Sequence, residues 1–308
     1  MDDYSYKKID IGEDYLAGKD NLLEILLVDK TTNKNILWAT DSYESRGKGF
    51  SFDKQIKTEL VTGIYGKVIQ PRAVKSKEEQ IYRKRVKAEV FTPLSVVKQM
   101  NDACDKKRVT KNNWQEYVSL LKLEITCGEA PYIVSRYDPV ADHQELIPLE
   151  KRVGFLDKKI RTVSKYCDEH KDWVHWVKIA FQSSYGYEWQ GDNLLIAREN
   201  LLYTFIDFYK DKFKKKPSIK LQKEIIEIIV WNIFQMDGLK YVIPMSCHHE
   251  VKTIPSIQTL FEEIPEKIEK YECEGCKFNR PDKHNGKYVK IMDWKENKKI
   301  RFVDIVSN

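Results

Sequence analysis

The residues best suited to bind a small polar ligand follow an apolar stretch near the middle of the chain. The stretch Tyr117–Ile125 contains Glu124 near its end and leads into a turn that contains Cys127 and Gly128. A carboxylate followed by a glycine-containing turn is typical of a parallel strand that presents a loop to a nucleotide-like ligand, because backbone N–H groups line such a turn. This pattern predicts a binding site at the carboxyl end of a strand.

Two later segments have the same form, an apolar stretch that ends at a carboxylate. Residues 185–189 contain Glu188 and Trp189 and precede a helical pattern, and residues 229–234 precede Asp237. A rival to Asp237 is Asp293, which follows a similar stretch. Parallel strands present their carboxyl ends at one edge of a sheet, so we expect these acids to lie near one ligand. We prefer Asp237 for the third position.

These segments, together with Phe91-Thr92-Pro93 upstream, resemble in order the cofactor motifs of the adenine-specific DNA methyltransferases of restriction-modification systems. In that family the first turn usually reads Asp-Pro-x-Cys-Gly-Ser/Thr-Gly. Here the acid and Cys-Gly are present, but Ala130 stands in place of the final glycine and Pro131 follows it. Alanine still allows a fairly close approach of the backbone, whereas proline removes one donor.

The resemblance implies that the chain binds S-adenosylmethionine. In that family the methionine end of the cofactor lies against Phe-Thr-Pro and the first turn. The ribose hydroxyls would bind Glu188, and the adenine would lie near Trp189 and Asp237. The implied cofactor-binding residues are Phe91, Thr92, Pro93, Glu124, Thr126, Cys127, Gly128, Glu188, Trp189 and Asp237.

The family holds its target adenine with Asn-Pro-Pro-Tyr or Asn-Pro-Pro-Phe, and neither occurs in the 308 residues. Transfer to the amino group of a flipped base depends on such a motif, so no catalytic residue is identified. Three interpretations stay open. The chain is an adenine (N6) methyltransferase whose active site a second restriction-modification subunit could complete, or it is a non-catalytic DNA-binding or regulatory partner that retains the fold. The third is a zinc-containing nucleic-acid-binding protein that binds no cofactor.

Positive charge is concentrated just before Phe91. A dense cluster of cations suits contacts with the phosphates of a nucleic acid. Its position before Phe91-Thr92-Pro93, together with the resemblance, implies double-stranded DNA as the partner. The alternative is a solvated face of a helix. The candidate DNA-binding residues are Arg72, Lys75, Arg83, Lys84, Arg85 and Lys87.

The C-terminal region contains four residues that could bind zinc: Cys247, Cys273, Cys276 and His284. The spacing Cys-x-x-Cys is right for two ligands of one ion. A second Cys-x-x-Cys is absent, so the preferred interpretation is that no metal is bound. A structural zinc ion is the less favoured alternative.

The composition, with 42% hydrophobic and 32% charged residues, is that of a folded protein with a full core. No apolar run reaches the length of about eighteen residues that a membrane span requires. The first residues lack the features of a signal peptide, and the six cysteines are scattered. We therefore expect a cytoplasmic protein with reduced thiols and no membrane partner.

The alternation of helical patterns and short apolar stretches around these residues predicts an α/β fold. Residues 88–245 are expected to form a Rossmann-like methyltransferase sheet with helices on both faces. Residues 1–87 are expected to form a mixed N-terminal region with the basic segment, and 246–308 a small irregular C-terminal extension with a β-hairpin. Helices are predicted to begin at Pro93, at Asp192 or Asn193, and after Ser218.

Overall fold

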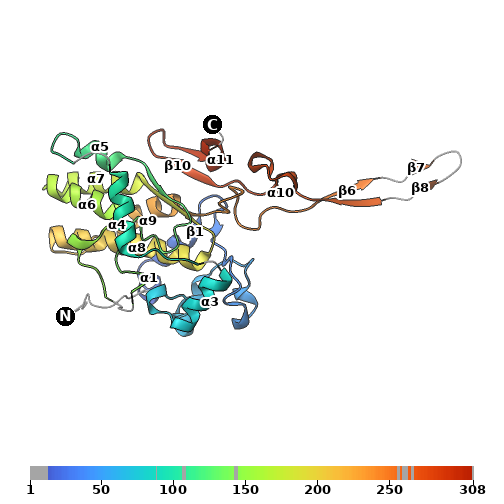
Figure 1. Cartoon of the computed structure of the whole chain (residues 1–308), viewed down its shortest axis with the longest axis horizontal. Helices are drawn as coiled ribbons and strands as arrows, with labels where there is room; N and C mark the ends of the chain where they lie inside the picture. The colour runs from blue at the N-terminus through green and yellow to red at the C-terminus, as the bar shows by residue number, and fades with distance from the viewer. Residues whose placement is uncertain are drawn as a thin grey trace. The chain divides into compact units, whose positions relative to one another are not determined.

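The computed structural model describes residues 13–87, 89–105, 109–141, 145–254, 257–258, 263–264 and 267–306. The chain has a mixed α/β structure, and it divides into two compact units between Gln235 and Met236 (Figure 1). The first unit thus contains both the expected N-terminal region and most of the expected cofactor domain. The second begins before the boundary at residue 246 that the sequence predicts.

A three-stranded parallel sheet lies in the first unit. It consists of β3 (Lys122–Glu124), β4 (Ser184–Glu188) and β5 (Ile233–Gln235), in the order β3-β4-β5. In register, Leu123 lies opposite Tyr185, and Tyr187 lies opposite Phe234. Because the strands are parallel, their carboxyl ends meet at one edge, where the predicted acids Glu124 and Glu188 are the last residues of their strands.

Two pairs of helices connect these strands, as parallel neighbours require. α6 (Phe155–Tyr166) and α7 (His170–Gln182) lie between β3 and β4, and α8 (Gly191–Phe213) and α9 (Ile219–Asn232) lie between β4 and β5. α7, α8 and α9 contact the sheet. The predicted cap of α9 is present, since the Ser218 side chain accepts a hydrogen bond from the backbone of the helix. None of the described helices combines the length and apolar character that crossing a bilayer demands.

The remaining elements of the first unit precede the sheet in sequence, apart from one short 3-10 turn between β3 and α6. They are α1 (Glu13–Ala17), α2 (Leu22–Leu27), β1 (Val28–Asp29), β2 (Lys34–Asn35), α3 (Lys77–Lys87), α4 (Leu94–Cys104) and α5 (Trp114–Ser119), with five short 3-10 turns between Glu44 and Val74 and a sixth at Leu149–Lys151.

Buried polar side chains join the N-terminal elements to the sheet. The guanidinium of Arg198, in α8, donates to the carbonyls of Val28 and Ile233 at 3.0 and 2.8 Å. The Gln235 side chain both accepts from the Leu37 N–H and donates to its carbonyl, each at 2.8 Å. These bonds explain why residues before 88 belong to the same unit as the sheet: backbone groups there complete the hydrogen bonding of buried side chains in α8 and β5.

The second unit consists mainly of antiparallel pairs. Its elements are β6 (Glu250–Ile254), β7 (Ile257–Gln258), β8 (Glu263–Ile264), β9 (Lys267–Tyr271), α10 (Glu274–Phe278), a 3-10 turn (Pro281–Lys283), β10 (Lys290–Asp293), β11 (Lys298–Arg301) and α11 (Phe302–Val306). β6 pairs with β9 and β7 with β8 along one hairpin (Figure 1). β10 pairs with β11 where the sequence predicts a hairpin, although the chain turns helical from Phe302.

Candidate functional site

The turn after β3 is closed by the acid at the end of that strand. The Glu124 carboxylate accepts hydrogen bonds from the backbone N–H groups of Tyr132 and Ile133, at 3.3 and 3.0 Å. Burial raises the pKa of this carboxyl well above its ordinary value, and the two hydrogen bonds offset the rise only in part. Glu124 therefore holds the ends of the turn together from inside the protein.

Every second residue of this turn, from position 126 to position 130, has a left-handed backbone conformation. The φ angles of Thr126, Gly128 and Ala130 are 44°, 53° and 64°. Glycine adopts this conformation freely, whereas residues with a Cβ are strained in it. Ala130, which replaces the glycine of the family motif, thus has the backbone conformation that a glycine would favour. Thr126 is exposed, while Cys127 is buried, and burial raises the pKa of the Cys127 thiol, so it is not an activated nucleophile.

The acid at the end of β4 is bonded to the turn after β3. One carboxylate oxygen of Glu188 accepts from the N–H of Gly128 at 2.8 Å, and the other accepts from Trp189 and Gln190 at 2.9 and 3.0 Å. Glu188 is only 7% exposed, and burial raises its pKa despite these bonds. Of about four acceptor positions on a carboxylate, three are occupied, which leaves room for one further donor.

Phe91 lies directly against the same turn. A Cβ added at Gly128 would stand 3.2 Å from the Phe91 ring, which is tighter than ordinary contact. The guanidinium of Arg72 lies over the Phe91 ring, 5.1 Å from its centroid. Thr92 is half-buried, and the exposed Pro93 immediately precedes α4, as predicted for a helix start. Phe91, Gly128 and Glu188, from three distant parts of the sequence, therefore meet in one place.

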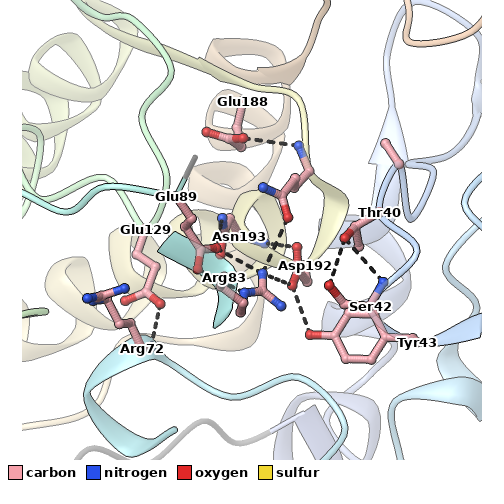
Figure 2. Close-up of polar contacts among 12 residues, drawn as sticks. Thr40, Ser42, Tyr43, Arg72, Arg83, Glu89, Glu129, Glu188, Asp192 and Asn193 are labelled. Atoms are coloured by element: carbon pink, nitrogen blue, oxygen red, sulfur yellow. Dashed lines mark hydrogen bonds and ion pairs between the residues drawn. The ribbon is translucent and has the colours of Figure 1, made fainter. Parts of the chain in front are cut away.

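Arg83, predicted to contact DNA, lies inside the protein, and Figure 2 shows its contacts with Glu89 and Asp192. It is 1% exposed, and its guanidinium contacts Glu89 through two hydrogen bonds of 2.8 Å and Asp192 through one of 2.7 Å. The Tyr43 hydroxyl donates to Asp192 at 2.8 Å, and Asn193 donates to Glu89 at 2.8 Å. These residues form a buried network that joins α3 to the first turn of α8.

The network shifts the pKa values of its acids. Burial alone would raise the pKa of Glu89 and of Asp192, but the positive charge and hydrogen bonds of Arg83 outweigh it, and both pKa values fall. The pKa of Arg83 itself rises, because the attraction of Asp192 and Glu89 exceeds the effect of burial. The three groups are therefore charged together, and each depends on the others.

The other predicted DNA-binding residues divide between interior and surface. Lys75 is 6% exposed, and its ammonium nitrogen has no hydrogen-bond partner within the described structure, although Glu89, Glu129 and Asp192 are near enough to interact with its charge. Arg72 is half-buried, and its backbone N–H donates to Glu129 at 2.6 Å (Figure 2).

Two cations of the basic segment, Lys84 and Arg85, are exposed. Lys87 is the last residue of α3, and its side chain lies outside the described part of the structure. Of the predicted DNA-binding side chains that the structure describes, these two are the ones at the surface. They are therefore the ones available for phosphate contacts.

The aromatic and the third acid of the predicted site have other neighbours. The Trp189 indole N–H donates to the Ala39 carbonyl at 2.9 Å, which ties β4 to the N-terminal part of the chain. Asp237 belongs to the second unit, where its carboxylate accepts from the N–H groups of Leu239 and Lys240 at 3.0 and 3.1 Å. Its rival Asp293 closes the β10–β11 turn by accepting from Lys295 and Glu296. Both acids cap turns.

The second unit brings together the four potential metal ligands. Cys247, Cys273, Cys276 and His284 each offer one atom, and these atoms all lie within 4.8 Å of one another. They come from the loop before β6, from the N-cap and first turn of α10, and from the residue after the 3-10 turn.

Sequence reasoning misses Glu129 and Asp192 as partners of the basic segment. The sequence indicates Asp192 only as a helix cap and Glu129 only as part of the turn, because neither has a sequence neighbour of opposite charge that would reveal the pairing. The described site is thus a strained turn, two buried carboxylates and an aromatic ring, an arrangement suited to binding a polar ligand through backbone and carboxylate groups. No family model, curated protein or solved structure matches this chain.

Proposed function

We propose that the first unit binds S-adenosylmethionine at the carboxyl ends of β3 and β4, as the cofactor-binding part of a Rossmann-like adenine-specific DNA methyltransferase. The proposal rests on the resemblance in sequence and on one structural observation. Phe91, the Gly128 turn and Glu188 correspond to three separate motifs of that family, and Phe91 and Glu188 both lie against Gly128. Chance matches scattered over the sequence would have no reason to meet.

The residues present fit the cofactor in chemical type. The Glu188 carboxylate retains an acceptor position, and ribose hydroxyls are donors that a buried carboxylate binds strongly. The N–H of Gly128 donates to Glu188, so a ligand with its own carboxylate or hydroxyls would compete for both partners of this bond. Bound S-adenosylmethionine would supply an activated methyl group, and the chain's part would be to hold and orient it.

The base-binding step is not assigned to any residue of this chain. Asn-Pro-Pro-Tyr and Asn-Pro-Pro-Phe are absent from the 308 residues, so the corresponding motif would have to come from polypeptide outside them. A feature of β3 favours such an addition. Leu123 lies in this edge strand, and Leu121 and Ile125 lie directly before and after it; the three alternate in sequence and are 44%, 64% and 64% exposed. Parallel sheets are normally covered on both faces, so this apolar face is suited to contact with a further segment.

Calorimetric titration with S-adenosylmethionine tests the proposal. We expect the wild-type protein to bind it and Glu188→Gln to bind at least about tenfold more weakly, because a charge-assisted hydrogen bond to a hydroxyl contributes about 1.5–3 kcal/mol. Glu150→Gln, at an exposed glutamate, is the matched control and should bind like the wild type.

A competition experiment uses only the wild-type protein, so it does not depend on whether a variant folds. Adenosine should displace the cofactor from the wild-type protein more effectively than 2′,3′-dideoxyadenosine, because only adenosine offers hydroxyls to Glu188. Absence of binding by the folded wild-type protein, or equal competition by the two nucleosides, would contradict the proposal.

A further inference from the structure

The four side chains Cys247, Cys273, Cys276 and His284 form a cluster that the proposed cofactor site does not use. The sulfur atoms of the three cysteines lie 3.5, 3.6 and 3.6 Å from Nδ1 of His284. When a tetrahedral zinc ion has Zn–S bonds of about 2.3 Å and Zn–N bonds of about 2.0–2.1 Å, each sulfur lies about 3.5–3.6 Å from the ligating nitrogen. The observed separations have these values.

Hydrogen bonding between the side chains cannot account for this arrangement. A neutral imidazole nitrogen has one lone pair, so Nδ1 can accept from one thiol but not from three. The three cysteines are free thiols, and they converge on the same nitrogen. A cation at the centre of the four atoms would satisfy all of them at once.

The backbone around the cluster is shaped for close approach of the ligands. A Cβ at Gly275 would stand 2.6 Å from Nδ1 of His284, and one at Gly286 would stand 3.0 Å from the Cys247 sulfur. The N–H of Asn285 donates to the Cys273 sulfur at 3.3 Å. Such N–H to sulfur bonds stabilise the negative charge of a metal-bound thiolate. Glycines therefore stand where any side chain would displace a ligand.

The loop that carries His284 is itself fixed. The hydroxyl of Tyr288 accepts from the His284 N–H and donates to the Pro281 carbonyl, both at 2.8 Å. These two bonds hold the histidine in position before any ion binds, which reduces the ordering that binding must impose.

We propose that Cys247, Cys273, Cys276 and His284 bind one zinc ion, which reverses the preference for no metal drawn from the sequence. Each cysteine loses its proton to solvent as its Zn–S bond forms, so three thiolates and a neutral imidazole complete a tetrahedral shell. With four protein ligands the ion has no open position, and its role is structural.

The ion would join the two ends of the β6–β9 hairpin. Cys247 stands shortly before β6 begins at Glu250, and Cys273 shortly after β9 ends at Tyr271. An isolated two-stranded hairpin is only marginally stable in water. A coordinated ion at its base supplies the stability that this hairpin lacks. The inference is independent of the proposed function, because it concerns only the second unit.

Elemental analysis of the full chain, produced and dialysed with zinc present, tests the proposal. We expect about one zinc per chain, falling to near zero in Cys276→Ser, while Cys104→Ser, at an exposed cysteine outside the cluster, keeps the wild-type content. Replacement of zinc by Co²⁺ should give the visible absorption of tetrahedral cobalt and a thiolate-to-cobalt charge-transfer band.

A thiol assay keeps the proposal testable if Cys276→Ser fails to fold. In the wild-type protein a chelator should expose about three additional alkylatable thiols, one for each cysteine ligand. Folded protein without zinc, zinc content that Cys276→Ser leaves unchanged, or a Cys273–Cys276 disulfide found by mass spectrometry would overturn the proposal.

Discussion

The backbone N–H of Gly128, in the turn after β3, donates a 2.8 Å hydrogen bond to the carboxylate of Glu188 at the end of β4. The bond joins two segments that are separate motifs in the sequence, and it fixes the turn relative to the neighbouring strand. It is also the point at which a bound cofactor would compete.

Gly128→Ala should destabilise the protein more than a substitution at an otherwise similar glycine. Gly63 has a comparable positive φ of 61° but nothing within 4 Å of an added Cβ, whereas at Gly128 the Phe91 ring is 3.2 Å away. Gly63→Ala should cost about 1–2 kcal/mol from backbone strain alone. Gly128→Ala should cost more, and adding Phe91→Leu should recover part of the difference. Urea unfolding measures all of these; equal losses at the two glycines would show that Phe91 does not restrict the turn.

Arg83→Met should be strongly destabilising, because Arg83 is buried although it belongs to a segment rich in cations. The substitution leaves Glu89 and Asp192 buried without their cation, which costs about 3–5 kcal/mol in free energy of unfolding. Lys84→Met, at the exposed neighbour in the same helix, should change stability by no more than about 0.5 kcal/mol. Chemical denaturation compares the two. A small effect of Arg83→Met would mean that the buried network is not formed in solution.

The contribution of Glu124 to the stability of the folded protein should decrease as the pH rises. Burial raises its pKa in the folded state above the ordinary value, so between these two pKa values the folded protein holds the proton that the unfolded chain has lost. This contribution to stability is present below the unfolded pKa and is lost as the pH rises toward the folded pKa. Glu124→Gln removes the contribution, so its stability relative to the wild type should increase with pH across that window.

Thermal or urea unfolding at several pH values measures this difference, with Glu145→Gln, at an exposed glutamate, as the control. Comparison with the wild type is essential because the lowered pKa values of Glu89 and Asp192 act in the opposite direction, losing stability as the pH falls. A stability difference between Glu124→Gln and the wild type that does not vary with pH would refute the assignment of a raised pKa to Glu124.

If the basic segment contacts DNA, its exposed cations should do so. The double substitution Lys84→Glu with Arg85→Glu should weaken binding to duplex DNA and make the dependence of affinity on salt less steep, by about 0.9 in the logarithmic slope for each phosphate that the protein no longer neutralises. Fluorescence anisotropy over a range of salt concentrations measures both quantities. Unchanged affinity and slope would remove this segment from the DNA interface.

Local sequence patterns predict helices and strands well where the residues that interact are close together in the sequence. Ser218 caps α9 because its side chain reaches the backbone N–H of Leu221, three residues on. The strands β3 and β4 likewise end at Glu124 and Glu188, as their apolar stretches predict, although residues 117–119 of the first stretch belong to the helix α5. In these cases one short segment contains both the residue and the neighbouring groups that determine its conformation.

Which cations of the basic segment are buried and which are exposed could not be predicted in this way. A run of cations looks like a solvent-exposed or phosphate-binding face until its partners are known, and Asp192, the partner of Arg83, lies in a helix far along the chain. The proposed zinc ligands pose the same difficulty, because Cys247 joins the Cys273–Cys276 pair only after the β6–β9 hairpin brings its ends together. Long-range pairing decides both sites.

The most direct test of the proposed cofactor site is the amide resonance of Gly128 during titration with S-adenosylmethionine. Cys127-Gly128 is the one Cys-Gly pair in the sequence, so labelling cysteine with ¹³C at the carbonyl and glycine with ¹⁵N isolates this resonance in a single HNCO peak. We predict that the peak moves progressively and saturates with the cofactor, and that GTP leaves it in place. A peak that stays fixed at saturating S-adenosylmethionine would contradict the proposal that the cofactor binds at the turn joined to Glu188.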